Sequence, residues 1–436
     1  MVRRNISELR AGMVLAEDVL TPGGRFLMPK GTTLDQGHLK SLHAWDLPDV
    51  GVEVPSEPPR EDRDPGEGHD SGEDRDRAEA LAAMAATVVR RRMDHVDLEH
   101  EAGRVLFGLA VDREVRRREA AGDADAASGP DADGASVADL PPLGAPEALL
   151  RDEPKLVSPP EVYLRISEVL RDPQSTVDDA AASISHDPSL AAKLLRLVNS
   201  SFYTRTMRAV RGRFPAKVDS LSRAVMVVGA RQLATLALGI SVLPLFQDIP
   251  PRWVNMRVFW EHSVGCAAAA QVIAAELGRD NAEAAFVAGL LHDIGRLIVF
   301  KQASQHMAAA MAQAAAEKRP LYETERERLG FDHAALGGEL LRKWQFPANL
   351  EKMVRYHHDL DEPLFIEEPA IIHLADCVAT AMGWGSSGNR QVPPLVPAAW
   401  DALGLTGERL GRMVPLMEAR LDETMRDFFP DRAGPP

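Results

Sequence analysis

The stretch that decides the fold is AGLLHDIGRLIVF, Ala288–Phe300, in which the adjacent pair His292-Asp293 lies within an otherwise apolar helical run. Neighbouring residues on a helix project about 100° apart, so an imidazole and a carboxylate meet at one point only if that point lies beside the helix. A divalent transition metal is such a point, because it accepts nitrogen and oxygen ligands together, whereas calcium prefers oxygen alone. For an isolated pair, hydrogen bonding to a neighbouring helix is the better explanation.

The sequence around this stretch is helical from about residue 154 to residue 430, with short breaks marked by Pro or Gly, and it shows no strand alternation. We therefore expect a mainly α, multi-helix domain. Further potential ligands lie among apolar residues on separate predicted helices: His262, His333, His357, His358 and Asp376. Each alone is best read as a core or surface residue. Together with His292-Asp293 they predict a buried metal centre, and the alternative is a polar core network that only stabilises the fold.

The composition of the whole chain restricts its class. The 436 residues are 45% hydrophobic, enough for two or three domains, and a formal charge of −15 argues against general affinity for nucleic acid or anionic membranes. Two cysteines, Cys266 and Cys377, are too few for a disulfide framework. The most apolar stretch, 233–246, is too short to span a bilayer, and residues 1–13 lack a continuous apolar segment. We expect a cytoplasmic protein that is not membrane-bound.

The chain ahead of the helical domain divides into four segments. Residues 1–55 alternate short apolar runs with turn residues and predict a small β-rich module. Residues 56–77 consist mainly of Glu, Asp, Arg, Pro and Gly, which predicts a disordered acidic linker. Residues 78–120 return to helical spacing and are expected to form a helical segment associated with the N-terminal module. Residues 121–153 predict a second disordered linker before the domain at 154–430.

Three basic stretches stand out against the acidic background: the runs Arg90-Arg91-Arg92 and Arg116-Arg117-Arg118, and the loop Arg205–Lys217. Each could bind an anionic group. A solvated helix face or loop is the preferred interpretation of all three.

The residues from about 154 to 429 resemble the HDOD domain, a helical relative of the HD and HD-GYP metal-dependent phosphohydrolases. The resemblance rests on separated motifs: SISHDPSLAAKLLRLVNSSFY, LSRAVMVVGARQLATLAL, FWEHSVGCAAA, EAAFVAGLLHDIGRLIVF, GFDHAALGGELLRKWQFP, and RYHHDL followed by HLAD. Residues 1–55 and the following helical segment are similar, more weakly, to a module that often precedes HD-GYP and HDOD domains.

The resemblance implies a metal site. The ligands of HD hydrolases, a His, an adjacent His-Asp and a distant Asp, match His262, His292, Asp293 and Asp376, and the second-metal histidines of HD-GYP enzymes are similar in position to His333 and His357 or His358. One or two divalent ions are implied, with iron, manganese, zinc and magnesium all admitted.

Three departures from the HD-GYP pattern separate this chain from those enzymes. Arg296 replaces a lysine, Asp359 replaces a glutamate, and the Gly-Tyr-Pro segment is absent. The departures argue against hydrolysis of cyclic di-GMP.

Two functional hypotheses follow from the resemblance. The preferred one is a bacterial signal-transduction module that regulates through contacts with signalling proteins and holds a metal. The alternative is an active phosphohydrolase or phosphodiesterase on a nucleotide or cyclic nucleotide, in which His292 and Asp293 serve catalysis through the metal and Arg296 contacts the phosphate. A snorkelling side chain is an equally good interpretation of Arg296.

Overall fold

The computed structural model describes the following residues: 2–5, 9, 13–16, 19–20, 26–28, 32, 34, 49–52, 71–121, 140–151, 161–171, 176–205, 217–246, 248–360 and 366–429. The chain separates into two compact units, Met1–Ser71 and Gly72–Pro436. Each is described by itself.

The first unit contains short antiparallel strand pairs. Strand β1 (Val2–Asn5) pairs with β4 (Asp49–Val52), with Val2 opposite Val52, and β2 (Val19–Leu20) pairs with β3 (Phe26–Met28). A small apolar cluster that includes Leu15, Leu34 and Val50 is buried beside them. Much of residues 1–55 lies outside the described residues, and the β-rich module stays a prediction.

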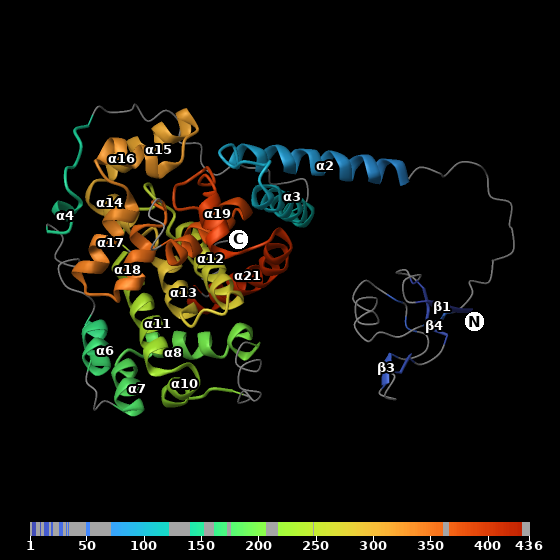
Figure 1. Cartoon of the computed structure of the whole chain (residues 1–436), viewed down its shortest axis with the longest axis horizontal. Coiled ribbons are helices and arrows are strands. Elements are labelled where there is room, and N and C mark those ends of the chain that lie inside the picture. Colours follow the sequence, from blue (N-terminus) through green and yellow to red (C-terminus); the bar gives the residue numbers. More distant parts are fainter. Residues whose placement is uncertain are drawn as a thin grey trace. The chain divides into compact units, whose positions relative to one another are not determined.

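The second unit is helical throughout its described residues, as the sequence predicts (Figure 1). Its helices are α2 (Ser71–Arg92), α3 (Glu101–Ala121), α4 (Pro146–Leu149), α6 (Glu161–Arg171), α7 (Val177–Ser185), α8 (Pro188–Val198), α10 (Leu221–Val228), α11 (Ala230–Val242), the 3-10 helix η3 (Leu243–Phe246), α12 (Met256–Glu276), α13 (Ala282–Leu291), α14 (Ile294–Gln302), α15 (Ser304–Glu317), α16 (Leu321–Leu329), α17 (His333–Lys343), α18 (Ala348–Arg355), α19 (Glu367–Met382), α20 (Pro397–Leu403) and α21 (Gly407–Phe428).

Helix α12 forms the centre of this unit and packs against α13, α19 and α21. Its alanine-rich middle is buried on every side, from His262 to Ala274. Small side chains allow the neighbouring helices to approach closely. A Cβ on Gly289 of α13 would lie 2.8 Å from the backbone N and Cα of Ala267 on α12, closer than real Cβ atoms come. The α12–α13 contact therefore depends on glycine at this position.

The pair His292-Asp293 lies at a junction between two helices, and not inside one helix as its apolar surroundings predict. Helix α13 ends at Leu291 with His292 as its C-cap, and Asp293 is the N-cap of α14. The turn of the backbone carries both side chains to one side. On a continuous helix the two adjacent side chains would project about 100° apart, and the junction between α13 and α14 removes this separation.

Helices α6, α7, α8, α10 and α11 form the other end of the unit, where α11 contacts α13 (Figure 1). The motif SISHDPSL explains how α8 begins, because the Asp187 carboxylate accepts hydrogen bonds from the backbone N–H groups of Ser189 and Leu190. At its end, the Asn199 amide donates to the carbonyl of Leu195 and exchanges hydrogen bonds with the backbone of Val218. The Asp-Pro and Asn-Ser residues of this segment are therefore helix caps. The interior of the predicted loop Arg205–Lys217 lies outside the described residues.

Two predicted boundaries differ from the structure. Helix α2 begins at Ser71, within the segment 56–77 predicted as linker, since its acidic and basic residues are also compatible with an exposed helix. Helix α3 contacts α19 and α21, so residues 78–120 form part of the helical unit, and their association with the N-terminal module stays a prediction. Buried Leu106 and the Glu101 carboxylate, which accepts from the Gly407 N–H, attach α3 to that unit.

The predicted linker 121–153 is also ordered near its end. Residues 140–151 lie against the helical unit: the Leu143 N–H donates to the carbonyl of Leu329, and the Lys343 ammonium donates to the carbonyl of Leu150. Leu150 is 1% exposed. Its proline, glycine and alanine content makes this stretch resemble a linker in the sequence. Its contacts with the helical unit are tertiary, so they leave no periodic pattern that would predict them.

Within the described residues, no single helix is both long and apolar enough to cross a membrane. Leu221–Val228 and Ala230–Phe246 meet that test only as a pair, and they are bent by 116° at the break between them.

Replacing Gly289 by alanine tests the close approach of α12 and α13. Gly289→Ala should lower the free energy of unfolding by roughly 1–3 kcal/mol, because the added methyl group meets backbone atoms that cannot move aside. Gly411→Ala on α21 is the matched control: nothing lies within 4 Å of its added Cβ, and it should stabilise by up to about 1 kcal/mol through helix propensity. Urea unfolding measures both. Equal effects would contradict this account of the packing.

Candidate metal centre

The structure brings all eight predicted site residues into one buried cluster. They come from five separate segments: His262 from α12, His292, Asp293 and Arg296 from the α13–α14 junction and the first turn of α14, His333 from the start of α17, His357 and His358 from the turn after α18, and Asp376 from α19. His358 is half-buried and the other seven are at most 4% exposed. No interaction between neighbours in sequence assembles such a set.

The first group of donor atoms surrounds Asp293 Oδ2. His292 Nε2 lies 2.9 Å and His262 Nε2 3.4 Å from this oxygen. Asp376 Oδ1 lies 3.3 Å from His262 Nε2 and 3.9 Å from His292 Nε2. Ligands bound to one metal at about 2.1 Å are separated by about 3 Å, so these spacings suit a common ion. His262, His292 and Asp293 could hold a metal.

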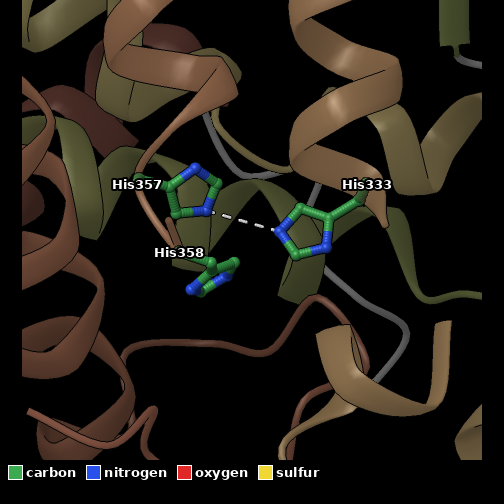
Figure 2. A group of neighbouring side chains, drawn as sticks. All are labelled: His333, His357 and His358. Atoms are coloured by element: carbon green, nitrogen blue, oxygen red, sulfur yellow. Dashed lines mark hydrogen bonds between the residues drawn. The ribbon is translucent and has the colours of Figure 1, made fainter. Parts of the chain in front are cut away.

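The second group is formed by His333, His357 and His358, which could also hold a metal ion. Figure 2 shows the three rings facing one another, with His333 Nε2 lying 3.4 Å from His357 Nε2. The ring of His358 stacks on Tyr322 at 4.3 Å, which fixes its plane. Asp293 joins this group to the first, because its other oxygen, Oδ1, lies 3.1 Å from His333 Nε2.

Hydrogen bonds at Nδ1 orient three of the histidines. His292 Nδ1 donates to the carbonyl of Gly289 at 2.7 Å, His357 Nδ1 to the carbonyl of Val354 at 2.7 Å, and His333 Nδ1 to Glu325 Oε2 at 2.5 Å. The proton on Nδ1 leaves the Nε2 lone pair directed at the cluster. This is the arrangement of a histidine that binds metal through Nε2 and is held by a second partner.

Glu325 of α16 is the principal site residue that the sequence interpretation missed. It is fully buried, and besides His333 it accepts a 2.8 Å hydrogen bond from Arg296 Nε. Because it lies in the charged run TERER, Glu325 resembles one of several exposed charges in the sequence. The signal that could have revealed it is helical spacing, because Leu321, Glu325 and Leu329 are four residues apart and occupy one buried face.

Arg296 is buried and fully engaged, so its interpretation as a snorkelling side chain is wrong. Its guanidinium lies 2.8 Å from both Asp293 Oδ1 and Glu325 Oε1 and donates to the Ser387 hydroxyl at 2.6 Å. These three partners hold it inside the protein. The geometry gives Arg296 a positioning role through Nε and Nη1, and its contact with a phosphate stays a prediction.

His373, although it lies on α19 with Asp376, belongs to the framework. Its Nδ1 donates to the carbonyl of His357 at 2.9 Å, and its Nε2 accepts from the Val396 N–H at 3.3 Å. Both ring nitrogens are therefore used, which leaves no lone pair for a metal. The residue fixes the turn that presents His357 and His358.

The charges in the cluster are balanced locally. Burial alone would raise the pKa of Asp293, but Arg296, His292 and His333 hold it well below its usual range. Burial lowers the pKa of His357 and His358 well below normal, so both are neutral, as metal ligands must be. Burial also opposes protonation of His262, yet Asp293 and Asp376 raise its pKa to about 9. Without metal, this shift favours the protonated form of His262 at neutral pH.

The raised pKa of His262 predicts a pH dependence for the metal-free protein. An unfolded histidine titrates near pH 6.5, so the stability contributed by the extra proton is complete below that pH and is lost as the pH rises toward 9. Chelator-treated protein should lose roughly 3 kcal/mol at most between pH 6.5 and 9, measured by urea unfolding. His262→Gln should flatten this dependence, and the exposed-site control His186→Gln should preserve it. Identical slopes for wild type and His262→Gln would count against the assignment.

Comparison with known proteins identifies the domain. Residues 156–360 match the HDOD domain family, so this part of the chain is an HDOD domain, as predicted. Asp376 lies beyond the matched segment and reaches the cluster through α19. The match does not include residues 1–55, and the resemblance of that segment to the module found before HD-GYP domains is not supported.

Proteins similar to this chain are found in several bacteria. A Shewanella amazonensis SB2B crystal structure, described as a candidate phosphohydrolase, shares the fold with a TM-score of 0.50 and 24% identity over 64% of this chain and 98% of that one. An HDOD domain protein with unknown function from Geobacter sulfurreducens gives 0.48 and 24%, over 63% and 93%. An uncharacterized protein of Treponema pallidum (strain Nichols) is 27% identical over 204 residues, 46% of this chain and 37% of that relative. This chain therefore spans little more than a third of it.

Proposed function

We propose that this protein is a cytoplasmic regulatory protein whose HDOD domain holds a divalent metal and acts through contacts with signalling proteins. The observation that supports the metal is the set of buried donor atoms without a hydrogen-bond partner among the described residues. They are His262 Nε2, His292 Nε2 and Asp293 Oδ2, and the oxygen lies 2.9–3.4 Å from the two nitrogens without forming a hydrogen bond, whereas Asp293 Oδ1 is paired with Arg296. Such atoms are costly in a protein interior unless a ligand satisfies them. In the polar-network alternative, contacts of His262 with Asp293 and Asp376 would satisfy these atoms without a metal.

The first metal is assigned to His262, His292, Asp293 and Asp376. Imidazole nitrogen and carboxylate oxygen suit zinc, iron or manganese, and magnesium, which prefers oxygen, suits this set less well. The second group, His333, His357 and His358, offers three imidazoles beside Arg296, and burial keeps His357 and His358 neutral. With Asp293 Oδ1 facing it, this group is the place for a second ion.

The depth of the cluster favours regulation over turnover. A divalent metal here would lower the pKa of a bound water and polarise a phosphoryl oxygen. These ligands, however, leave little room for a substrate to reach the metal, because His262, His292 and Asp293 are at most 2% exposed. Arg296, which the sequence offered as a phosphate contact, is held by two carboxylates.

The second candidate function is a phosphohydrolase acting on a nucleotide. The observation in its favour is the Asp293 carboxylate, whose two oxygens face the two groups separately, as in sites that hold two ions. In this function half-buried His358 is the residue through which a substrate would approach. The Shewanella protein's description is consistent with this candidate, although the likeness extends to the fold alone.

Metal analysis tests the proposal directly. Purified wild-type protein should carry at least one transition metal per chain, and Asp293→Asn, which keeps the shape but removes the charge, should lose most of it. Glu325→Gln should weaken metal binding by about 10–100-fold, because His333 loses its orienting carboxylate. His186→Ala, at an exposed histidine outside the cluster, should leave the metal content unchanged. Metal-free wild type after growth and purification with added metals would overturn the proposal.

Turnover distinguishes the two functions. The regulatory proposal expects no hydrolysis of phosphomonoesters or of linear and cyclic nucleotides by metal-loaded protein. Metal-dependent hydrolysis that disappears in Asp293→Asn and persists in His186→Ala would establish the second candidate instead.

A further inference from the structure

Two arginine runs singled out in the sequence meet at one cavity of about 930 Å³. It lies where the end of α2 and the second half of α3 approach the end of α19, and Arg91 and Arg92 line it together with Arg117 and Arg118. Lys318 and Arg390 complete the cationic lining from two other segments. The preferred sequence interpretation, a solvated helix face, describes exposed Arg91 and Arg117 but not Arg92 and Arg118, which are partly buried.

The charge of this cavity opposes that of the protein. Arg113 brings the cations to seven, and the acidic side chains in the lining are Asp94 and Glu114, whereas the whole chain carries a formal charge of −15. Such a local excess of positive charge concentrates anions at the site. Like charges that lie close together destabilise a fold unless a partner of opposite charge screens them. The excess of cations in this lining therefore calls for such a partner.

Glu114 holds part of this lining in place. Its carboxylate is 4% exposed and accepts hydrogen bonds from Arg117 at 2.8 and 2.9 Å and from Arg118 at 2.8 Å. Burial would raise its pKa, but the two arginines lower it to about 2, so it stays ionised. Glu114 thus fixes two guanidinium groups at the cavity wall, and their side-chain entropy is lost before any ligand arrives.

Two further arginines attach the cavity to α19. Arg92 donates to the carbonyl of Ala381 at 2.8 Å, and Arg113 donates to the carbonyl of Met382 at 2.7 Å. Arg113 Nε also donates to Glu418 Oε1 at 2.8 Å. A guanidinium has five N–H donors, so these bonds still use only part of each group. Gly383, at φ +66°, follows directly, and a Cβ there would lie 2.8 Å from Arg92 Nη1. Glycine lets the arginine reach the end of the helix.

A purely structural role would account for Arg92, Arg113 and Glu114, which join α2 and α3 to the domain. It does not account for Arg91 and Lys318, which are exposed at the same cavity. Planar guanidinium groups recognise phosphate oxygens by paired hydrogen bonds, and ammonium groups add charge. Apolar Val88 and Ala315 in the lining offer a surface for a base.

We propose that the cavity between α2, α3 and the end of α19 binds a nucleotide that carries two or more phosphates. The phosphates lie among the arginines and Lys318, and the volume is in the range of pockets that hold small organic ligands. The site is separate from the metal centre and needs no metal. It adjoins Met382 and Gly383 at the end of α19, the helix that supplies Asp376, so a ligand here contacts the same helix as the metal site.

Calorimetric titration of the full chain tests this site. ATP and inorganic tripolyphosphate are titrated in chelator, which removes any contribution of metal. The double variant Arg91→Gln/Lys318→Asn removes two exposed cations, and asparagine suits the left-handed backbone of residue 318 (φ 53°). Its affinity for ATP should fall at least tenfold. The matched control Arg223→Gln/Arg412→Gln removes two exposed arginines of α10 and α21 and should bind like wild type.

The outcomes separate the parts of the proposal. Asp293→Asn should bind ATP as wild type does, because the metal centre is not involved. Absence of binding to either polyphosphate at millimolar concentration, or equal weakening in the double variant and its control, would overturn the site. Equal affinity for ATP and tripolyphosphate would overturn the assignment to nucleotides. Thermal unfolding of both double variants checks that the comparison is made between folded proteins.

Discussion

The neutralisation of one buried carboxylate, that of Asp293, is the constraint on which the helical domain depends. A carboxylate that is 1% exposed is stable only if charges and donors surround it. Three imidazoles, His262, His292 and His333, and one guanidinium do so. Three of these four groups are fixed by further partners: Gly289 for His292, and Glu325 for both His333 and Arg296. Without the partners that fix them, the polar groups around Asp293 would be too costly to bury.

The same constraint explains the glycines around the cluster. A Cβ on Gly295 would lie 2.1 Å from the carbonyl oxygen of His333, so α14 can approach the start of α17 only with glycine at this position. This approach places His333 Nε2 within 3.1 Å of Asp293 Oδ1. Backbone contact and charge compensation are therefore parts of one arrangement, and a change in either displaces the other.

The sequence was sufficient for the helical class of the domain and for the membership of the cluster, because ionisable residues within apolar helices are rare and each one carries information. His262, His333 and Asp376 were all identified in this way. Glu325 was missed because it lies among exposed charges, and only its spacing from Leu321 and Leu329 marks it. The junction at His292-Asp293 was missed because LLHDIG contains no proline and its glycine is needed for packing against His333 rather than for a turn.

The N-terminal boundaries were less accessible for a different reason. Docking of α3 on α19 and α21, and of residues 140–151 on α14 and α17, depends on single long-range bonds such as that between Glu101 and Gly407. Composition measures whether a segment can bury a core of its own. It does not show whether the segment is attached to another core, so segments that are polar in sequence were placed outside the domain.

The distribution of the cluster over five segments has a consequence for how the chain acquires it. His262 is synthesised early in the domain and Asp376 far later, after most of the helices between them. Chains emerge from the ribosome at about 5–20 residues per second, so the early ligands wait seconds for the last one. During that interval the nascent chain presents an incomplete set, and long-range closure of α19 onto α12 is the step that completes it. Completion of the cluster is thus a late event in the biogenesis of the protein.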